Sequence, residues 1–571
     1  MTFNNKYHRK PILLLDIVST KGVKRMQRQF SYQQRKQWLK HINDNTFDVL
    51  VIGGGITGAG IALDAATRNL KVVVVEMNDY ASGTSGRTSK LIHGGLKYLK
   101  QMNFRVISEI SKERKIVAEN APHVTKSINI CLPYYKESKI GPLLTRFGLT
   151  VYDTIAGLSK EEKSVILSST ETLNKIPYIK NENLLGSGMF SEYLTNDSRI
   201  NIEVIKQAVK EGAWALNYTK VEKLLMEDGI VCGAYLKDSL TGEVHVVKAK
   251  KVINATGPWI FSLDKSHINE SPLSSKWVKG SHIVFSQKRF PLEKGTYFEN
   301  DEGKLMFAIP FRKSVFVGTT ESLYEGDIEN PQVTEEEKEY LLNDMNKFFQ
   351  GLNLTKEDII SSWAGIRTLY GKALKDIQDN SAIAEIWISC KNLITVAGGK
   401  LTNYRSVAEK VVDTVLEDKE LQCKAEFYKS LTRAMTLSGG DLGFTACYEN
   451  FTATMLQKAT QMGWKEELSK KLIKIYGGNV DVIFGYKERF KDLRDTSKLP
   501  DKIFYPLLYG VLEEQVMTPE DFFVRRTGWF YFERELVREY YDDALVLIKE
   551  LLKLSDVDYK SYTEKYKYLQ E

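Results

Sequence analysis

Three glycines near the start of the chain have the spacing of a dinucleotide-binding turn. Gly53, Gly55 and Gly58 fit the pattern G-x-G-x-x-G. The first glycine of this pattern permits a tight turn, the second lets the backbone approach a pyrophosphate, and the third lets a helix pack closely on a strand. The N-terminus of that helix then attracts the phosphate. Glu76 can accept hydrogen bonds from a ribose hydroxyl, and its negative charge disfavours a 2′-phosphate.

Two further segments favour FAD over NAD as the dinucleotide. A loop of Ser, Thr and Gly residues spans positions 81–89 and contains Thr84, Ser85 and Ser89. A second glycine turn with a lysine lies far downstream, at residues 398–400. Distant segments that return to one cofactor suit an extended FAD better than an NAD held by one compact domain. From composition alone, the loop could also be a solvated surface loop.

The elements around the glycines have the pattern of a strand–helix–strand unit. Residues 47–52 form an apolar, β-branched segment that predicts a buried strand. Apolar residues then recur at helical spacing as far as Asn69, and residues 71–76 predict a second buried strand. A strand–helix–strand unit of this kind implies a parallel sheet, so we expect an α/β, Rossmann-like domain.

The remainder of the chain divides into a mixed region and a helical region. Residues 77–420 alternate short strands, helices and turns, with apolar strands expected at 251–254 and 393–397. From about residue 430 helical patterns dominate, as at 452–462, 465–476 and 544–554. We therefore predict a basic extension at 1–46, a cofactor and substrate region at 47–425, and a helical domain at 430–571.

Composition restricts the class of protein. The 571 residues suggest two or three domains. No run of about 18 apolar residues occurs, so no transmembrane helix is expected. The five cysteines are far apart in the sequence and no Cys/His cluster has metal-ligand spacing, so we expect reduced, mostly buried thiols in a cytoplasmic protein and no metal site.

The formal charge of +7 is concentrated at the N-terminus. Residues 1–46 contain ten Lys and Arg against two Asp and Glu, so the remainder of the chain is close to neutral. A basic excess on a short tail does not indicate a nucleic-acid partner. The extension could be a solvated tail, an apolar and basic segment that rests on an anionic membrane, or, with less support, a cleaved targeting peptide.

Several motifs together resemble a known family. The chain is similar to the FAD-dependent glycerol-3-phosphate dehydrogenases, within the D-amino-acid oxidase-like flavoproteins, over about residues 45–555. The resemblance implies a Rossmann-like FAD domain, an interwoven antiparallel-sheet substrate domain and a C-terminal helical domain. The motifs that carry it are 88–99, 254–259, 279–283, 307–310, 318–320, 362–367, 397–402 and 521–528.

The same resemblance implies an activity. It is the oxidation of sn-glycerol 3-phosphate to dihydroxyacetone phosphate by hydride transfer to FAD. Electrons would then pass to membrane quinone, which implies peripheral attachment to the cytoplasmic face of the cell membrane and allows a homodimer. Three other readings remain open: an oxidase that uses O2 and produces H2O2, a different substrate such as an amino acid, and a flavin-binding protein without turnover.

Flavin-dependent alcohol oxidation needs a base and cations for the phosphate. Histidine is the natural base near neutral pH. Of the two histidines in the family motifs, we favour His282 as base and place His93 beside the flavin. Arg367 is the expected phosphate ligand, because a guanidinium pairs with phosphate oxygens, and Lys97 and Tyr98 assist it. The cofactor contacts are then expected at Gly53, Gly55, Gly58, Glu76, Thr84, Ser85, Ser89, Leu91, His93, Gly257, Gly399, Lys400, Leu401 and Thr402.

Two departures and two alternative readings accompany this assignment. The family usually has Arg where this chain has Lys97, which loses bidentate geometry, and often has Pro where it has Thr368. The histidines could be ordinary core residues, and Arg367 could lie in a surface ion pair. The segment before Arg525 and Arg526 could be a helix start packed on the core with the two arginines solvated, and no catalytic role is assigned to them.

Overall fold

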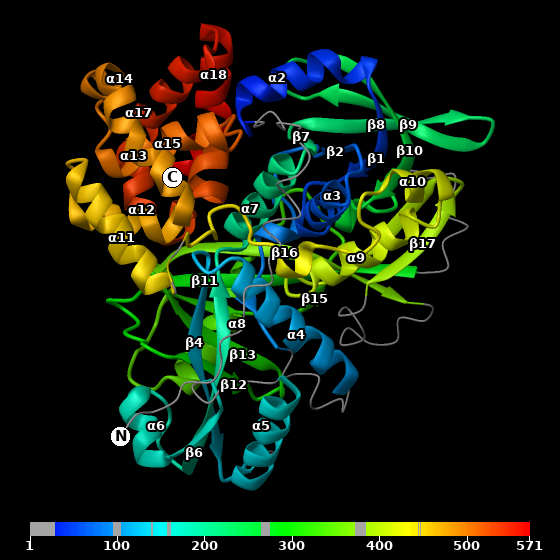
Figure 1. Cartoon of the computed structure of the whole chain (residues 1–571). Helices are drawn as coiled ribbons and strands as arrows, with labels where there is room; N and C mark the ends of the chain where they lie inside the picture. The colour runs from blue at the N-terminus through cyan, green and yellow to red at the C-terminus, as the bar shows by residue number, and fades with distance from the viewer. Residues whose placement is uncertain are drawn as a thin grey trace, which may run out of the picture.

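The computed structural model describes residues 29–94, 104–138, 141–156, 162–263, 274–371, 384–443, 445 and 447–570. Figure 1 shows two β-sheets and a helical C-terminal part, drawn in orange and red, which lies beside them. The expected α/β architecture with a helical C-terminal domain is therefore confirmed.

The first sheet contains the predicted strand–helix–strand unit. β1 (Thr46–Ile52) pairs in parallel with β2 (Val72–Val75), and α3 (Ile56–Thr67) connects them. β1 also pairs in parallel with β10 (Val244–Asn254), and the carboxyl ends of these strands therefore meet at one edge of the sheet. The other strands of this sheet are β7 (Trp214–Leu216), β8 (Thr219–Glu227), β9 (Ile230–Asp238), β17 (Glu385–Cys390) and β18 (Leu393–Ala397).

Helices pack closely around α3. Its neighbours are α7 (Asp197–Lys210) and α9 (Tyr404–Val415). A Cβ on Gly60 would lie 2.7 Å from the Tyr404 ring, so only glycine permits this approach of α3 to α9. α10 (Lys419–Lys424) follows α9 in the chain.

The second sheet has ten strands and is antiparallel except where β12 pairs with β4. Its longest pairing joins β11 (Ser274–Ser286) to β16 (Ile359–Gly371). The other strands are β3 (Leu91–Ile92), β4 (Thr125–Tyr135), β5 (Val165–Ser168), β6 (Leu184–Thr195), β12 (Gly295–Glu299), β13 (Leu305–Phe311), β14 (Ser314–Gly318) and β15 (Ser322–Leu323). The helices of this region are α4 (Phe104–Asn120), α5 (Pro142–Ala156), α6 (Ser169–Lys175) and α8 (Glu335–Phe348). Because strands of the two sheets alternate along the chain, the domains are interwoven as expected.

The C-terminal part has its own apolar core. Its aromatic and aliphatic side chains form a buried cluster separate from the core of the first sheet. The helices are α11 (Tyr448–Gln461), α12 (Glu466–Tyr476), α13 (Val480–Arg489), α14 (Lys491–Thr496), α15 (Asp501–Glu513), α16 (Trp529–Phe532), α17 (Arg534–Leu552) and α18 (Asp556–Lys565). The three helices expected from periodicity correspond to α11, α12 and α17.

The last part of the N-terminal extension is folded. Residues Tyr32–His41 form α2, and Trp38 stacks on Trp214 with ring centroids 5.8 Å apart. The Arg35 guanidinium is buried in an ion pair with Asp238 at 2.7 Å. A solvated tail is therefore the wrong description for this segment, and residues 1–28 lie outside the described residues.

The cysteines are less buried than expected. Only Cys131 is buried, where desolvation raises the pKa of its thiol to about 11. Cys423 is exposed and the other three are intermediate. The expectation of mostly buried thiols therefore holds for Cys131 alone.

Candidate active site

The glycine turn between β1 and α3 leaves no room for side chains. Gly53 has φ +111°, and a Cβ there would lie 2.5 Å from the carbonyl oxygen of Ala255. A Cβ on Gly58 would lie 1.9 Å from the carbonyl oxygen of Gly53. Glycine at both positions therefore brings the turn, the helix and the end of β10 into direct contact.

Glu76, at the end of β2, is hydrogen-bonded to this turn. Its carboxylate accepts hydrogen bonds from the N–H of Gly54 at 2.7 Å and the N–H of Asn78 at 2.9 Å. Burial raises the pKa of Glu76, although the two N–H donors act in the opposite direction. A carboxylate has about four acceptor positions, so it can hold the turn and still accept from a ribose hydroxyl.

The loop at residues 81–89 joins the two sheets. The Ser85 hydroxyl accepts from the N–H of Ile56 at 2.9 Å, in the first turn of α3. The Thr84 hydroxyl donates to the carbonyl of Ile366 in β16. A Cβ on Gly365 would lie 2.3 Å from the carbonyl oxygen of Arg87. The loop therefore crosses β16 at a glycine and is not a solvated surface loop.

His282 lies on β11 in an apolar environment. Its ring stacks on Trp363 of β16, with centroids 4.8 Å apart and an angle of 8° between the rings. Its Nε2 atom is 3.1 Å from the Ser89 hydroxyl, and its Nδ1 atom has no hydrogen-bond partner among the described residues. Burial, assisted by the positive charge of Lys90, lowers the pKa of His282 to about 3. The imidazole is therefore neutral at pH 7.

Arg367 shares a sheet face with His282. The register pairs Trp363 with His282 and Arg367 with Val278, and residues four apart on a strand point to the same side. The two positions are separated by roughly 13 Å along the strands, from about 3.3 Å per residue. Arg367 is partly exposed and forms an ion pair with Glu321 at 2.8 Å, as the alternative reading of this residue anticipated.

The predicted downstream turn reaches the same edge of the first sheet. Gly399, with φ +88°, Lys400, Leu401 and Thr402 connect β18 to α9. The Thr402 hydroxyl donates to the carbonyl of His93 at 3.4 Å, so this turn meets the segment that follows β3.

The remaining predicted residues fall into two groups. Leu91 is buried in β3, and the carbonyl of Gly257, just beyond β10, accepts from the Tyr370 hydroxyl at 3.1 Å. Lys97 and Tyr98 lie outside the described residues.

Asp197 lies in this region, although no sequence motif predicted it. It is fully buried in the first turn of α7 and accepts from the N–H of Thr88 at 2.9 Å and from Lys90 Nζ at 2.7 Å. Lys90 Nζ in turn lies 5.0 Å from the centroid of the Trp363 ring. The sequence could have indicated this position, because Asn196 and Asp197 are residue types that cap helix N-termini and they directly follow a strand.

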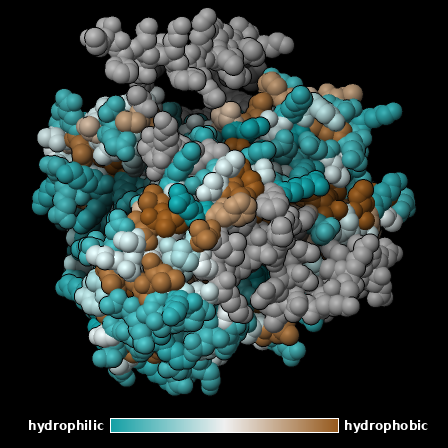
Figure 2. Space-filling view, turned by 90° about the horizontal axis from the view of Figure 1, so that it is seen from below, coloured by the Kyte–Doolittle hydropathy of each residue, from teal (hydrophilic) through white to brown (hydrophobic). Residues whose placement is uncertain are grey.

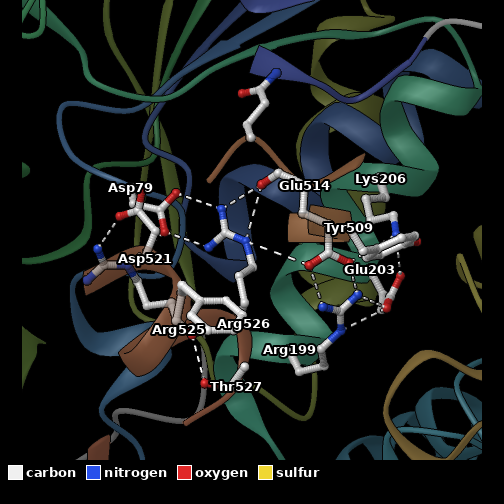
Figure 3. Close-up of polar contacts among 12 residues, drawn as sticks. Asp79, Arg199, Glu203, Lys206, Tyr509, Glu514, Asp521, Arg525, Arg526 and Thr527 are labelled. Atoms are coloured by element: carbon white, nitrogen blue, oxygen red, sulfur yellow. Dashed lines mark hydrogen bonds and ion pairs between the residues drawn. The ribbon is translucent and has the colours of Figure 1, made fainter. Parts of the chain in front are cut away.

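Arg525 and Arg526 are buried, contrary to the expectation that they are solvated. Arg526 donates to both oxygens of Asp79, at 2.6 and 2.9 Å, and Arg525 Nε donates to the same carboxylate at 2.7 Å. Figure 3 shows this cluster continuing through Glu514 to Arg199. The two arginines can be buried because Asp79, which follows β2, and the nearby Glu520 and Asp521 pair with their charges.

Comparisons with known proteins agree with this architecture. The family described as "FAD dependent oxidoreductase" matches residues 48–402, and that described as "C-terminal domain of alpha-glycerophosphate oxidase" matches residues 430–558. Aerobic glycerol-3-phosphate dehydrogenase of Bacillus subtilis (strain 168) is 42% identical over 539 residues, which cover 94% of this chain and 97% of the relative.

Two solved structures extend the comparison. Glycerol-3-phosphate dehydrogenase from Bacillus halodurans, complexed with FAD, has a TM-score of 0.81 at 36% identity and covers 95% of this chain and 98% of its own. L-alpha-glycerophosphate oxidase from Mycoplasma pneumoniae, with FAD bound, has a TM-score of 0.52 at 20% identity over 65% of this chain and 95% of its own, a similarity of fold alone.

Proposed function

The chain belongs to the family of FAD-dependent glycerol-3-phosphate dehydrogenases, and from this premise we propose that His282, Arg367 and Lys400 serve the oxidation of sn-glycerol 3-phosphate and that membrane quinone receives the electrons. The observation that carries the assignment of residues is the position of a neutral His282 and of Arg367 on one sheet face, beneath a loop that leads to the glycine turn.

The chain's own residues fit FAD. The turn at Gly53 and Gly58 has no room for a Cβ, so the glycines let the backbone pack closely here, and the N-terminus of α3, where Ile56 donates to Ser85, is the place where a phosphate would be held. Glu76 stands at the end of β2, where a ribose acceptor is needed. When bound, FAD supplies the acceptor for the hydride that leaves C2 of the substrate.

His282 is the proposed base. Its neutral imidazole takes the proton of the C2 hydroxyl at a ring nitrogen, so that the alcohol becomes a ketone as C2 loses its hydride. A pKa of about 3 makes it a weak base in the unliganded protein. An anionic group of the bound substrate within about 4–6 Å of the imidazole would favour the protonated form and raise this pKa. Lys400 is proposed to place its own positive charge near the flavin, where it would favour the anionic reduced form.

Arg367 is the proposed phosphate ligand. The ion pair with Glu321 keeps the guanidinium in place before substrate arrives. A substrate phosphate must either share the guanidinium with the Glu321 carboxylate or displace that carboxylate. Sharing is feasible because a guanidinium has separate N–H groups that can donate to two acceptors. Lys97 and Tyr98 are proposed as further ligands.

Use of a membrane quinone requires contact with lipid, and α5 has a surface suited to it. Leu143 and Phe147, one turn apart, are 85% and 67% exposed, and Arg146 is exposed between them. No helix among the described residues is long and apolar enough to cross a membrane. Figure 2, which views this end of the molecule, shows apolar patches among hydrophilic ones. We propose that the α5 face enters the interface and that the basic residues before α2 hold the protein to anionic lipid.

Oxygen is the second candidate acceptor. It is favoured by the description of the family that matches residues 430–558, which names a glycerophosphate oxidase. Counting hydrogen peroxide per substrate oxidised in air, with and without a water-soluble quinone, separates the two. A yield of about one hydrogen peroxide per substrate oxidised, unchanged when quinone is added, would establish the oxidase.

A further inference from the structure

A buried aspartate connects the cofactor region to the C-terminal domain. Asp79 lies in the loop that follows β2 and is fully buried. Its carboxylate accepts from Arg525, twice from Arg526, and from Asn217 Nδ2 at 3.0 Å. Burial raises the pKa of Asp79, but the two guanidinium groups prevail and hold it below its ordinary value. The carboxylate is therefore ionised and fully paired.

The two arginines are held by acceptors of their own domain. Both belong to a single π-helical turn, η9 (Asp521–Arg526), which directs adjacent residues towards one carboxylate. Arg525 also pairs with Glu520 at 2.7 Å and with Asp521 at 2.6 Å. Arg526 Nη2 donates to the carbonyl of Glu514 at 2.7 Å. Since these partners fix the guanidinium groups, it is the loop carrying Asp79 that is positioned by them (Figure 3).

Tyr80 makes a second contact of the same kind. Its hydroxyl donates to Gln515 Oε1 of the C-terminal domain at 2.9 Å. Its ring carbon Cδ1 is 2.8 Å from the point that a Cβ on Gly54 would occupy, so the side chain packs against the glycine turn. The N–H of Ala81 then donates to the carbonyl of Gly54 at 3.3 Å.

The segment held in this way lies between two proposed cofactor ligands. Glu76 stands three residues before Asp79, and Ser85 stands five residues after Tyr80. Both contact the glycine turn in the described structure. A loop ordered before binding lowers the entropic cost of binding a ligand.

We propose that Asp79 and Arg526 are positioning residues for FAD, through which the C-terminal domain orders the segment from Glu76 to Ser85. The inference rests on the proposed function only in assigning Glu76 and Ser85 to the cofactor. It makes retention of FAD depend on contacts between residues 447 positions apart.

The test compares holoenzymes that differ in one buried charged side chain. Asp79→Asn keeps the shape and removes the charge, and Arg526→Lys keeps the charge and removes the bidentate contact. The matched control is Asp64→Asn. Asp64 is equally buried and pairs with Arg68 at 2.7 Å, but it lies in the last turns of α3, away from the glycine turn. FAD release after dilution is followed by flavin fluorescence, at a temperature where circular dichroism shows every variant folded.

We expect D79N and R526K to release FAD at least tenfold faster than wild type, with D64N within twofold. Equal release from D79N and D64N would overturn the proposal. If D79N does not fold, Tyr80→Phe removes the second contact alone and is expected to speed release severalfold, whereas unchanged release would count against the proposal. Reduction of the FAD that remains bound, by glycerol 3-phosphate, reports on the proposed function separately.

Discussion

His282 of β11 and Trp363 of β16 are paired on neighbouring strands, and their rings stack on one face of the sheet with centroids 4.8 Å apart. The indole therefore fixes the plane of the imidazole, and the Trp363 Nε1–H donates to the carbonyl of Thr88 at 3.2 Å. A histidine held in this way keeps one orientation, as a group that accepts a proton from a defined substrate atom must.

Replacing the proposed base should slow the chemistry and leave the cofactor bound. For His282→Asn we expect flavin reduction in a single turnover to slow by about 10²–10⁴-fold, the usual contribution of a general base. Stopped-flow absorbance under anaerobic conditions measures it. His245→Asn, at a buried histidine of β10, is the control. A rate within tenfold of wild type would transfer the role of base to His93.

Removing the proposed phosphate ligand should act on one substrate only. Arg367→Ala is expected to raise the KM for glycerol 3-phosphate by about 10–150-fold, equivalent to the roughly 1.5–3 kcal/mol of a charge-assisted contact. Glycerol lacks the phosphate and should be little affected. Glu321→Gln, which releases Arg367 from its ion pair, should not raise this KM. Equal losses with both substrates would show that Arg367 acts on the fold or the flavin.

The buried neutral imidazole predicts a pH dependence of stability. The pKa of His282 is about 3 when folded and about 6.5 when unfolded, so between these values only the unfolded chain binds the proton. The contribution of the neutral side chain to the free energy of unfolding is therefore complete above pH 6.5. Below pH 6.5 this contribution falls by up to about 1.4 kcal/mol per pH unit. Urea unfolding from pH 7 to pH 5 should show a shallower decline for H282N than for wild type. Parallel curves would contradict the assigned pKa.

The two proposed membrane contacts should respond differently to salt. A chain that begins at Gln29 retains α2 and loses the basic residues before it, whereas truncation near Asn45 would also remove the buried Arg35 and Trp38. The shorter chain should lose the salt-sensitive part of its binding to anionic vesicles. Leu143→Ser with Phe147→Ser should lose the part that persists in high salt. Co-sedimentation at two ionic strengths checks both predictions, and binding by both variants that equals that of the full chain would exclude both contacts.

Local patterns predicted the cofactor half of the structure well. The segments 47–52 and 71–76 became β1 and β2, because buried parallel strands are continuous apolar runs. The glycines are needed where the turn was expected, since a Cβ at Gly53 or Gly58 would strike backbone. His282 and Arg367 were predicted from the family resemblance and not from spacing. The register of β11 and β16 shows that they lie on one face of the sheet.

Contacts between segments that are distant in the chain could not be predicted from the sequence. The sequence near Arg526 contains the carboxylates of Glu514, Glu520 and Asp521, but nothing in it points to Asp79, which is 447 positions away and accepts from both arginines. The helix α2 was likewise not predicted, because the basic composition of the N-terminal extension is typical of a solvated tail. The sequence does not show that Asp238 of β9 pairs with Arg35.

The most direct test of the account is anaerobic mixing of the FAD-loaded protein with sn-glycerol 3-phosphate, followed by reoxidation with either a quinone or oxygen. We expect glycerol 3-phosphate to bleach the flavin, with one dihydroxyacetone phosphate formed per flavin, and quinone to restore the oxidised spectrum much faster than oxygen does. A flavin that glycerol 3-phosphate leaves oxidised would contradict the proposed reaction, and faster reoxidation by oxygen with stoichiometric peroxide would contradict the proposed acceptor.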